Sequence, residues 1–148
     1  MHSIMRILSM DVGERRIGMA LSDALGIIAQ QLETLLRKDE ESDFKRIREI
    51  IEEKGVTEIV VGLPLNMDGT AGPKAEEINR FVEKLKAECG VPVKIWDERL
   101  TTRQANRLLI EADISRKKRK KLDDKLAAQL ILQSYLDSIS VNKDGEDV

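Results

Sequence analysis

Hydrophobic and polar positions repeat with two different periods along the chain, and these periods predict its secondary structure. Near-continuous apolar runs indicate strands that are covered on both faces. Apolar residues at every third or fourth position, with a capping residue before them and a glycine after them, indicate amphipathic helices. We therefore expect strands at about 5–12, 16–22, 31–37, 58–63 and 91–96, and helices at about 42–54, 73–88, 102–112 and 123–137.

Capping residues set the expected ends of the first two helices. Ser42 is the expected N-cap of the first helix, and Gly55 ends it. Pro73 occupies the first turn of the second helix, and Gly90 follows its last turn.

The order of the elements predicts an α/β fold. Three consecutive strands followed by alternating helices and strands favour a mixed five-stranded sheet. In such a sheet an antiparallel meander of three strands is extended by two parallel strands, and helices cover both faces. We expect a single domain over 1–148, with 1–4 as an extension and 139–148 as a disordered tail. Functional sites of these sheets lie at the carboxyl ends of the parallel strands.

The composition limits the chemistry that the chain can perform. Its 41% hydrophobic and 35% charged residues are typical of a globular protein. No apolar stretch reaches the ~20 residues of a membrane helix and no signal-peptide pattern is present, so we expect a cytoplasmic protein. The single histidine, His2, and the single cysteine, Cys89, exclude Cys/His zinc sites and histidine-based nucleophilic triads. Catalysis must depend on carboxylates, lysines, hydroxyls or a hard metal ion.

Acidic residues occur where three apolar elements end or begin. Asp11 ends the first strand, although capping of the following turn explains this residue equally well. Asp97 and Glu98 close the last strand, and because strand residues alternate between faces, only one of them points to the site. Asp124 lies on the inner side of the last helix, opposite its polar side. Together these acids predict an oxygen-ligand site for Mg²⁺ or Mn²⁺ and hydrolysis of phosphodiester bonds.

Two further segments bear on the substrate. The basic block 116–121 precedes Asp124 and is either a solvated run or a grip on a nucleic-acid backbone. The loop 62–74 lacks the signature of a nucleotide P-loop, but it leads into a helix start and can hold a backbone phosphate; ordinary turn chemistry explains it equally well. Since aromatic residues make up only 3% of the chain, base stacking is disfavoured and a structured duplex, junction or helix end is favoured.

Four blocks of the sequence, in order over about residues 5–138, together resemble the YqgF (RuvX) family. The resemblance implies an RNase H-like fold in a bacterial cytoplasmic protein, with divalent metal bound at Asp11, Glu98 and Asp124. Family members are described as Holliday junction resolvases and as nucleases that mature the 5′ end of pre-16S rRNA. The blocks are Met10-Asp11-Val12-Gly13 with Arg16-Ile17-Gly18, Val61-Gly62-Leu63-Pro64 with Gly69, Asp97-Glu98-Arg99-Leu100-Thr101, and Asp124 with Ala127-Ala128 and Ile131-Leu132.

We therefore expect a Mg²⁺- or Mn²⁺-dependent endonuclease that processes structured RNA, in particular the 5′ end of pre-16S rRNA in ribosome biogenesis. One alternative is resolution of four-way DNA junctions, which requires two active sites and a stable dimer. The other is a non-catalytic nucleic-acid-binding or transcription-associated module. We expect a monomer or weak homodimer with no membrane partner. Asp11, Glu98 and Asp124 are the expected catalytic residues, and substrate binding is assigned to Gly13, Arg16, Asn66, Lys74, Arg99 and Arg103.

Overall fold

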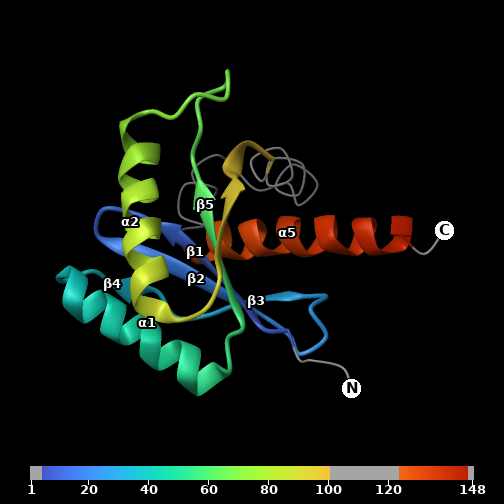
Figure 1. The fold of residues 1–148 in the computed structure, drawn as a ribbon, viewed down its shortest axis with the longest axis horizontal. Coiled ribbons are helices and arrows are strands. Elements are labelled where there is room, and N and C mark those ends of the chain that lie inside the picture. Colours follow the sequence, from blue (N-terminus) through green and yellow to red (C-terminus); the bar gives the residue numbers. More distant parts are fainter. Residues whose placement is uncertain (1–4, 101–123, 147–148) are drawn as a thin grey trace, which may run out of the picture.

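A computed structural model describes the backbone of residues 5–100 and 124–146, and the side chains within 5–100 and 126–139. Its strands form one sheet between helices, and the course of the chain can be followed in Figure 1. The elements are β1 (Ile7–Val12), β2 (Arg16–Ser22), β3 (Ala29–Gln31), β4 (Leu35–Leu36), α1 (Glu40–Lys54), β5 (Glu58–Leu63), α2 (Pro73–Cys89), β6 (Val93–Asp97) and α5 (Asp124–Glu146).

The sheet has the strand order β3-β2-β1-β5-β6, with β4 paired to β2. β1 and β2 are antiparallel, whereas β5 is parallel to β1 and β6 is parallel to β5. This arrangement confirms the expected mixed sheet, in which a meander is extended by two parallel strands. The carboxyl ends of β1, β5 and β6 therefore lie at the same edge of the sheet.

The single strand expected over 31–37 is wrong, because two short strands, β3 and β4, take its place, and the sheet of the described residues has six strands and not the expected five. Both pair with β2, but the registers differ by one residue: Ala20 lies opposite Gln31, and Ile17 lies opposite Leu35. Residues 32–34 thus oppose only residues 18–19 of β2. An extra residue of this kind bulges out of the ladder and interrupts the strand.

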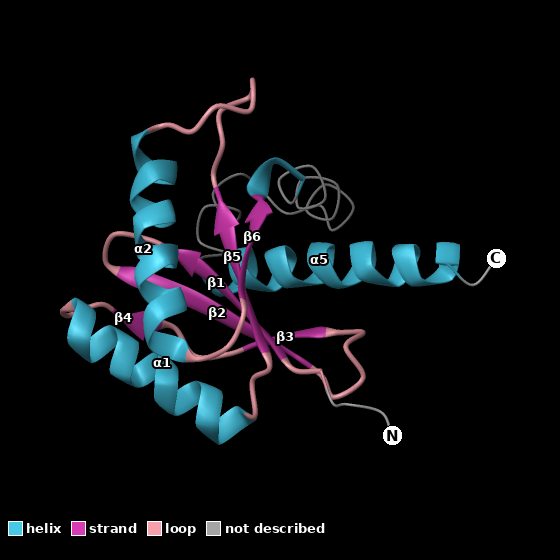
Figure 2. Cartoon of the chain, viewed as in Figure 1, coloured by secondary structure: helices cyan, strands magenta, loops and turns pink. Residues whose placement is uncertain are grey.

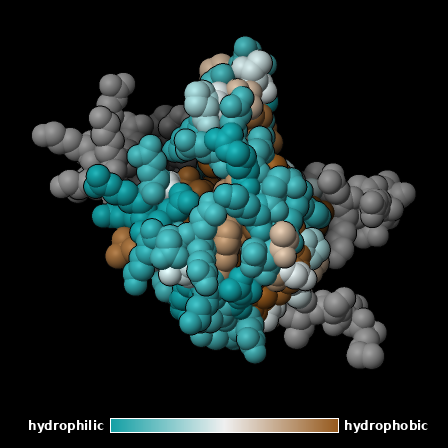
Figure 3. Space-filling view, turned by 60° about the vertical axis from the view of Figure 1, so that its left-hand side comes forward, coloured by the Kyte–Doolittle hydropathy of each residue, from teal (hydrophilic) through white to brown (hydrophobic). Residues whose placement is uncertain are grey.

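Helices cover both faces of the sheet, as expected (Figure 2). On one face, α1 and α2 contribute Ile47, Ile50 and Leu85 to a buried cluster with strand residues. On the other face, Ile131 and Leu132 of α5 pack against the sheet in a second cluster. The outer sides of α1 and α2 carry charged residues, and the surface drawn in Figure 3 is largely hydrophilic.

The helix ends agree with the sequence at glycines but not at the first N-cap. Gly55 and Gly90 follow α1 and α2 with φ of 65° and 73°, the left-handed conformation that glycine adopts without strain. The N-cap of α1 is Asp39 and not Ser42, since the Ser42 N–H donates to Asp39 Oδ1 at 2.8 Å. The expected Ser42 cap is therefore wrong, and α1 begins one turn earlier than the sequence indicated.

The last helix is longer than expected. α5 extends to Glu146, beyond the end expected near residue 137 and into the segment 139–148 expected as a tail. Ile139 still packs against the cluster under α5, which prolongs the apolar side of the helix. The helix expected over 102–112 lies outside the described residues. Among the described helices, none is both long and apolar enough to cross a membrane.

Candidate active site

An acid of β1, a glycine of β5 and the acid that follows β6 lie on one face of the sheet. In β1, Ile7 packs in the cluster under α5 and Ser9 Oγ donates to the Ala128 carbonyl of α5 at 2.6 Å. Asp11, two residues further, is of the same parity and therefore projects to the α5 face at the strand end. In β6, Trp96 packs against the same cluster, and Glu98 follows β6 as the first residue of a helical turn, with its side chain against Gly62 of β5.

Gly62 of β5 lies between these two acids and makes room for Glu98. A Cβ atom on Gly62 would be 2.7 Å from Glu98 Oε1 and 2.5 Å from Ile131 Cδ1. The Glu98 side chain therefore crosses the backbone of β5 where no side chain stands, on the way to Asp11 of β1. Only glycine permits this approach.

The carboxyl groups of Asp11 and Glu98 interact closely. Burial, the charge of Asp11 and a hydrogen bond with the Asp11 side chain together raise the pKa of Glu98 to about 7. The Lys74 ammonium acts in the opposite sense and lowers the pKa of Glu98. Two acids held together in this way attract a proton or a cation.

Asp97, the alternative to Glu98 in the sequence, is bound by Arg99 instead. The Arg99 guanidinium donates to both carboxylate oxygens of Asp97, with a shortest distance of 2.7 Å, and the Arg99 N–H donates to Asp97 Oδ1 at 2.9 Å. These hydrogen bonds lower the pKa of Asp97. Of the two acids that close β6, the structure thus brings Glu98 to Asp11.

Arg99 also holds the loop between β5 and α2. Its Nη1 donates to the Met67 carbonyl at 3.3 Å, and it lies against Gly69, whose φ is 88°. Within the loop, the Asn66 side chain donates to Thr70 Oγ1 at 3.0 Å. Arg99 and Asn66, which the sequence assigns to the substrate, are thus engaged in shaping this loop.

Of the other expected substrate residues, two lie at the β1–β2 turn that follows Asp11, and the third lies at the start of α2. Gly13 forms the tight β1–β2 turn, in which its N–H donates to the Arg16 carbonyl at 2.8 Å. Arg16 is exposed at the start of β2. Lys74 is exposed in the first turn of α2, after Gly72, which caps that helix without a side-chain hydrogen bond. The α2 N-terminus therefore presents backbone N–H groups and an ammonium group near Glu98.

The third expected acid is located by backbone only. Asp124 is the first residue of α5, and Ala128, one turn later, accepts the hydrogen bond from Ser9. The first turns of α5 thus lie against β1. Arg103 and the basic block 116–121 lie outside the described residues. Among the residues that are described, no group of three or more His, Cys, Asp or Glu side chains is placed to hold a metal ion.

Sequence reasoning missed Gly62 and Ser9. A glycine inside a strand of β-branched residues is a recognised sign of close approach and provides a signal for Gly62. Ser9 gave no signal beyond being a polar residue in an apolar strand. It satisfies its hydroxyl by bonding to the backbone of α5, and it is completely buried.

The sheet order and the acids at the ends of β1 and β6 define an RNase H-like α/β protein. Comparison with solved structures supports this fold: RuvC from T. thermophilus in complex with a Holliday junction substrate matches with a TM-score of 0.63 at 15% identity, over 93% of this chain and 96% of that chain. A second T. thermophilus RuvC structure matches with a TM-score of 0.52 at 16% identity, over 88% and 92% of the two chains.

The chain belongs to the RuvX family, whose sequence model is described as "Holliday junction resolvase" and matches residues 5–138. Curated relatives carry the name "Putative pre-16S rRNA nuclease". One from Clostridium acetobutylicum is 56% identical over 135 residues, which span 91% of this chain and all of the relative. One from Thermoanaerobacter pseudethanolicus is 57% identical over 135 residues, or 90% of this chain and 97% of the relative. The family match covers every block on which the resemblance in the sequence depends.

Proposed function

We propose that this protein is a metal-dependent endonuclease that hydrolyses phosphodiester bonds in structured RNA at the 5′ end of pre-16S rRNA. The observation that carries the proposal is the contact between Asp11 and Glu98 at the carboxyl ends of β1 and β6. The pre-16S substrate is supported by the name of relatives that are more than half identical to this chain. We further propose that it acts in the cytoplasm as a monomer or weak homodimer.

Asp11, Glu98 and Asp124 are the proposed ligands of Mg²⁺ or Mn²⁺. The donor set fits such an ion, because carboxylate oxygens are the ligands that hard divalent cations prefer. The raised pKa of Glu98 also fits, since a bound cation relieves the repulsion between the two carboxylates. When bound, the ion polarises the phosphodiester and activates a water molecule for attack at phosphorus.

The surrounding residues are proposed to bind and orient the substrate. Lys74 and the N-terminal N–H groups of α2 offer positive charge beside Glu98, which favours a phosphate there. Arg16 and Arg103 are proposed to contact further phosphates. Arg99, held by Asp97, and Asn66 keep the β5–α2 loop in shape for the substrate.

Resolution of a four-way DNA junction is the second candidate, favoured by the description of the matching family model. The chemistry at the carboxylates would be the same. A junction has two strands to cut, so this function requires two active sites in a stable dimer. The oligomeric state of the purified protein in the presence of a junction therefore separates the two candidates.

The test is cleavage by purified protein of a matched panel of rRNA precursor ends and four-way DNA junctions, with Mn²⁺ or with a chelator. We expect the protein to cleave the RNA only when Mn²⁺ is present. Asp11→Asn and Glu98→Gln should each reduce the rate of this cleavage by at least ~10²-fold. Asp97→Asn is the matched comparison, because it also removes one negative charge from the end of β6. Since Asp97 holds Arg99 and through it the β5–α2 loop, this variant should raise KM for the RNA and change kcat only roughly a few-fold, whereas Glu98→Gln should lower kcat. Equal losses of kcat in the Glu98 and Asp97 variants would overturn the site assignment, and binding without cleavage of any substrate would favour the non-catalytic module.

A further inference from the structure

Among the described residues, Asp43 is the charged side chain that the fold buries, with 3% of its surface exposed. It lies in the first turn of α1, on the face of the sheet opposite to Asp11 and Glu98. A buried carboxylate requires hydrogen bonds or a counter-charge to be tolerated. Its partners therefore indicate what its burial achieves.

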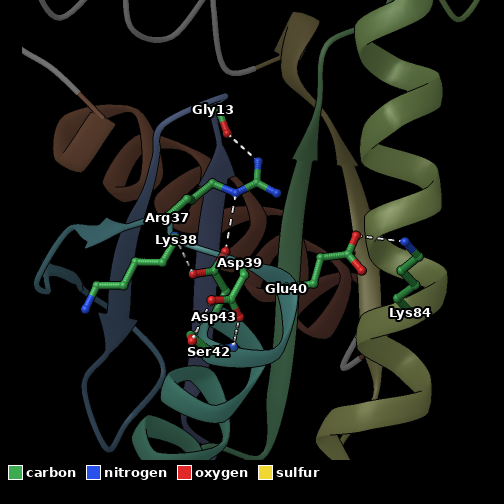
Figure 4. Close-up of polar contacts among 8 residues, drawn as sticks. All are labelled: Gly13, Arg37, Lys38, Asp39, Glu40, Ser42, Asp43 and Lys84. Atoms are coloured by element: carbon green, nitrogen blue, oxygen red, sulfur yellow. Dashed lines mark hydrogen bonds and ion pairs between the residues drawn. The ribbon is translucent and has the colours of Figure 1, made fainter.

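Asp43 holds the segment that enters α1. Its Oδ1 accepts the Lys38 N–H at 3.1 Å, and its Oδ2 lies 3.7 Å from Arg37 Nε. Figure 4 shows the Arg37 side chain between Asp43 and the β1–β2 turn. Asp43 thus holds Arg37 in two ways: through the backbone N–H of the neighbouring Lys38 and through the Arg37 guanidinium.

Arg37 in turn binds the turn that follows Asp11. Its Nη1 donates to the Gly13 carbonyl at 2.6 Å, and its backbone N–H donates to the Arg15 carbonyl at 2.8 Å. The guanidinium also lies 5.5 Å from the centre of the Phe81 ring of α2. One side chain therefore connects the turn, α1 and α2.

On this side the turn borders a cavity. A cavity of about 440 Å³ separates it from α2 and is lined by Gly13, Glu14 and Arg37 together with α2 residues such as Phe81 and Lys84. Glu14, in the middle of the turn, is exposed. Arg37 crosses the side of this cavity and ties the turn to the body of the protein.

The energetics favour a positioning role for this pair over a stabilising one. A buried ion pair is often no more stabilising than apolar residues of similar volume. What it adds is a donor of fixed direction, here aimed at the carbonyl two residues after Asp11. With its backbone N–H on the Arg15 carbonyl as well, Arg37 restrains both sides of the turn at the end of β1.

We propose that Arg37 and Asp43 are positioning residues, which hold the β1–β2 turn from the far face of the sheet and keep Asp11 against Glu98. The effect of Arg37 and Asp43 on metal binding rests on the proposed function, because that function assumes that Asp11 and Glu98 are metal ligands. Their effect on the contact between Asp11 and Glu98 does not rest on the proposed function.

The test uses a double variant, Arg37→Met with Asp43→Asn. It removes both charges together, keeps the net charge of the protein, and leaves an acceptor for the Lys38 N–H, so that no buried charge is orphaned. The control is Arg46→Met with Glu33→Gln, which removes another ion pair of α1, one that does not touch the turn. Circular dichroism and urea unfolding establish that both proteins fold.

The first readout is metal-free and needs no substrate. In the parent protein, Asp11→Asn should relieve the repulsion from Glu98 and shift the unfolding equilibrium toward the native state about tenfold at about pH 8. In the double variant the same change should give less than about a twofold shift, because the acids have moved apart. In the control variant the tenfold shift should persist. An equal shift in all three backgrounds would overturn the proposal.

The second readout is Mn²⁺ affinity, measured as free Mn²⁺ by electron paramagnetic resonance. The double variant should bind Mn²⁺ at least ~10-fold more weakly than the parent, and the control should be unchanged, as is typical when the support of a metal ligand is removed. Parent-like affinity in the double variant would contradict the positioning role. If the parent binds no Mn²⁺ or cleaves no RNA, the proposed function fails, and the metal-free comparison still decides the role of Arg37 and Asp43.

Discussion

Raising the pH of the metal-free protein should destabilise it through Glu98. Burial and the neighbouring Asp11 raise the pKa of Glu98 to about 7 in the folded protein, against 4.5 for an ordinary glutamate. The folded state therefore holds this proton more tightly than the unfolded state does. The stability contributed by the protonated carboxyl is complete below about pH 4.5 and is lost as the pH rises through about 7. Each pKa unit corresponds to ~1.4 kcal/mol, so the loss is at most about 3–4 kcal/mol.

Urea unfolding at about pH 5 and about pH 8, in chelator, measures this loss directly. Glu98→Gln is the control, because its side chain has the same shape but cannot ionise. Subtracting the stability change of this variant from that of the wild-type protein removes the contributions of all other titrating groups. Mn²⁺ should restore the stability of the wild type at the higher pH, since a cation bound to the native carboxylates stabilises only the folded state. If the wild type and Glu98→Gln lose equal stability between the two pH values, the reasoning about Glu98 is refuted.

Three further changes test the surroundings of the site and the first helix. Gly62→Ala should destabilise the protein by about 1–3 kcal/mol in urea unfolding, and it should reduce cleavage ~10²-fold because the new methyl group displaces Glu98. Lys74→Gln should raise the pKa of Glu98 further, seen as a move of its carboxyl NMR titration to higher pH, because the ammonium lowers that pKa. Asp39→Ala should cost about 1 kcal/mol by loss of the helix cap, measured by thermal or urea unfolding, whereas Ser42→Ala should cost less.

The periodicity of the sequence was sufficient for the main elements but not for details that depend on distant partners. The strands and helices follow from apolar runs and from glycine and proline positions, and their order predicts the mixed sheet. The bulge between β3 and β4 was not predicted. It arises from the change of register between these two strands and their partner β2, which the local sequence does not reveal. The N-cap of α1 was not predicted, because three residues at its start are capable of capping: Asp39, Ser42 and Asp43. Burial of Asp43 beside Arg37 decides among them.

The candidate site was predicted in part for similar reasons. Asp11 and the acids that close β6 are visible in the sequence as charges at the ends of buried strands. The choice between Asp97 and Glu98 depends on Arg99, which lies two residues beyond Asp97 and whose guanidinium binds the Asp97 carboxylate. Gln129 and Gln133 of α5 are polar residues four positions apart, yet they bond to the backbone of β3 and of the loop before it. Such polar residues cannot be distinguished from surface residues by periodicity alone.

The parity of two strands and the helical turn after β6 explain why the site forms where it does. Every second residue of β1 leads from the buried Ser9 to Asp11, and β5 leads from Val60 to Gly62 in the same way, so both series face α5, whose first residue is Asp124. β6 ends at Asp97, and Glu98 begins a helical turn from which its side chain lies over Gly62. A shift of β6 by one residue on β5 would move Glu98 away from Gly62. The register of β6 on β5, in which Trp96 lies opposite Gly62, is therefore as necessary to the carboxylate pair as the acids themselves.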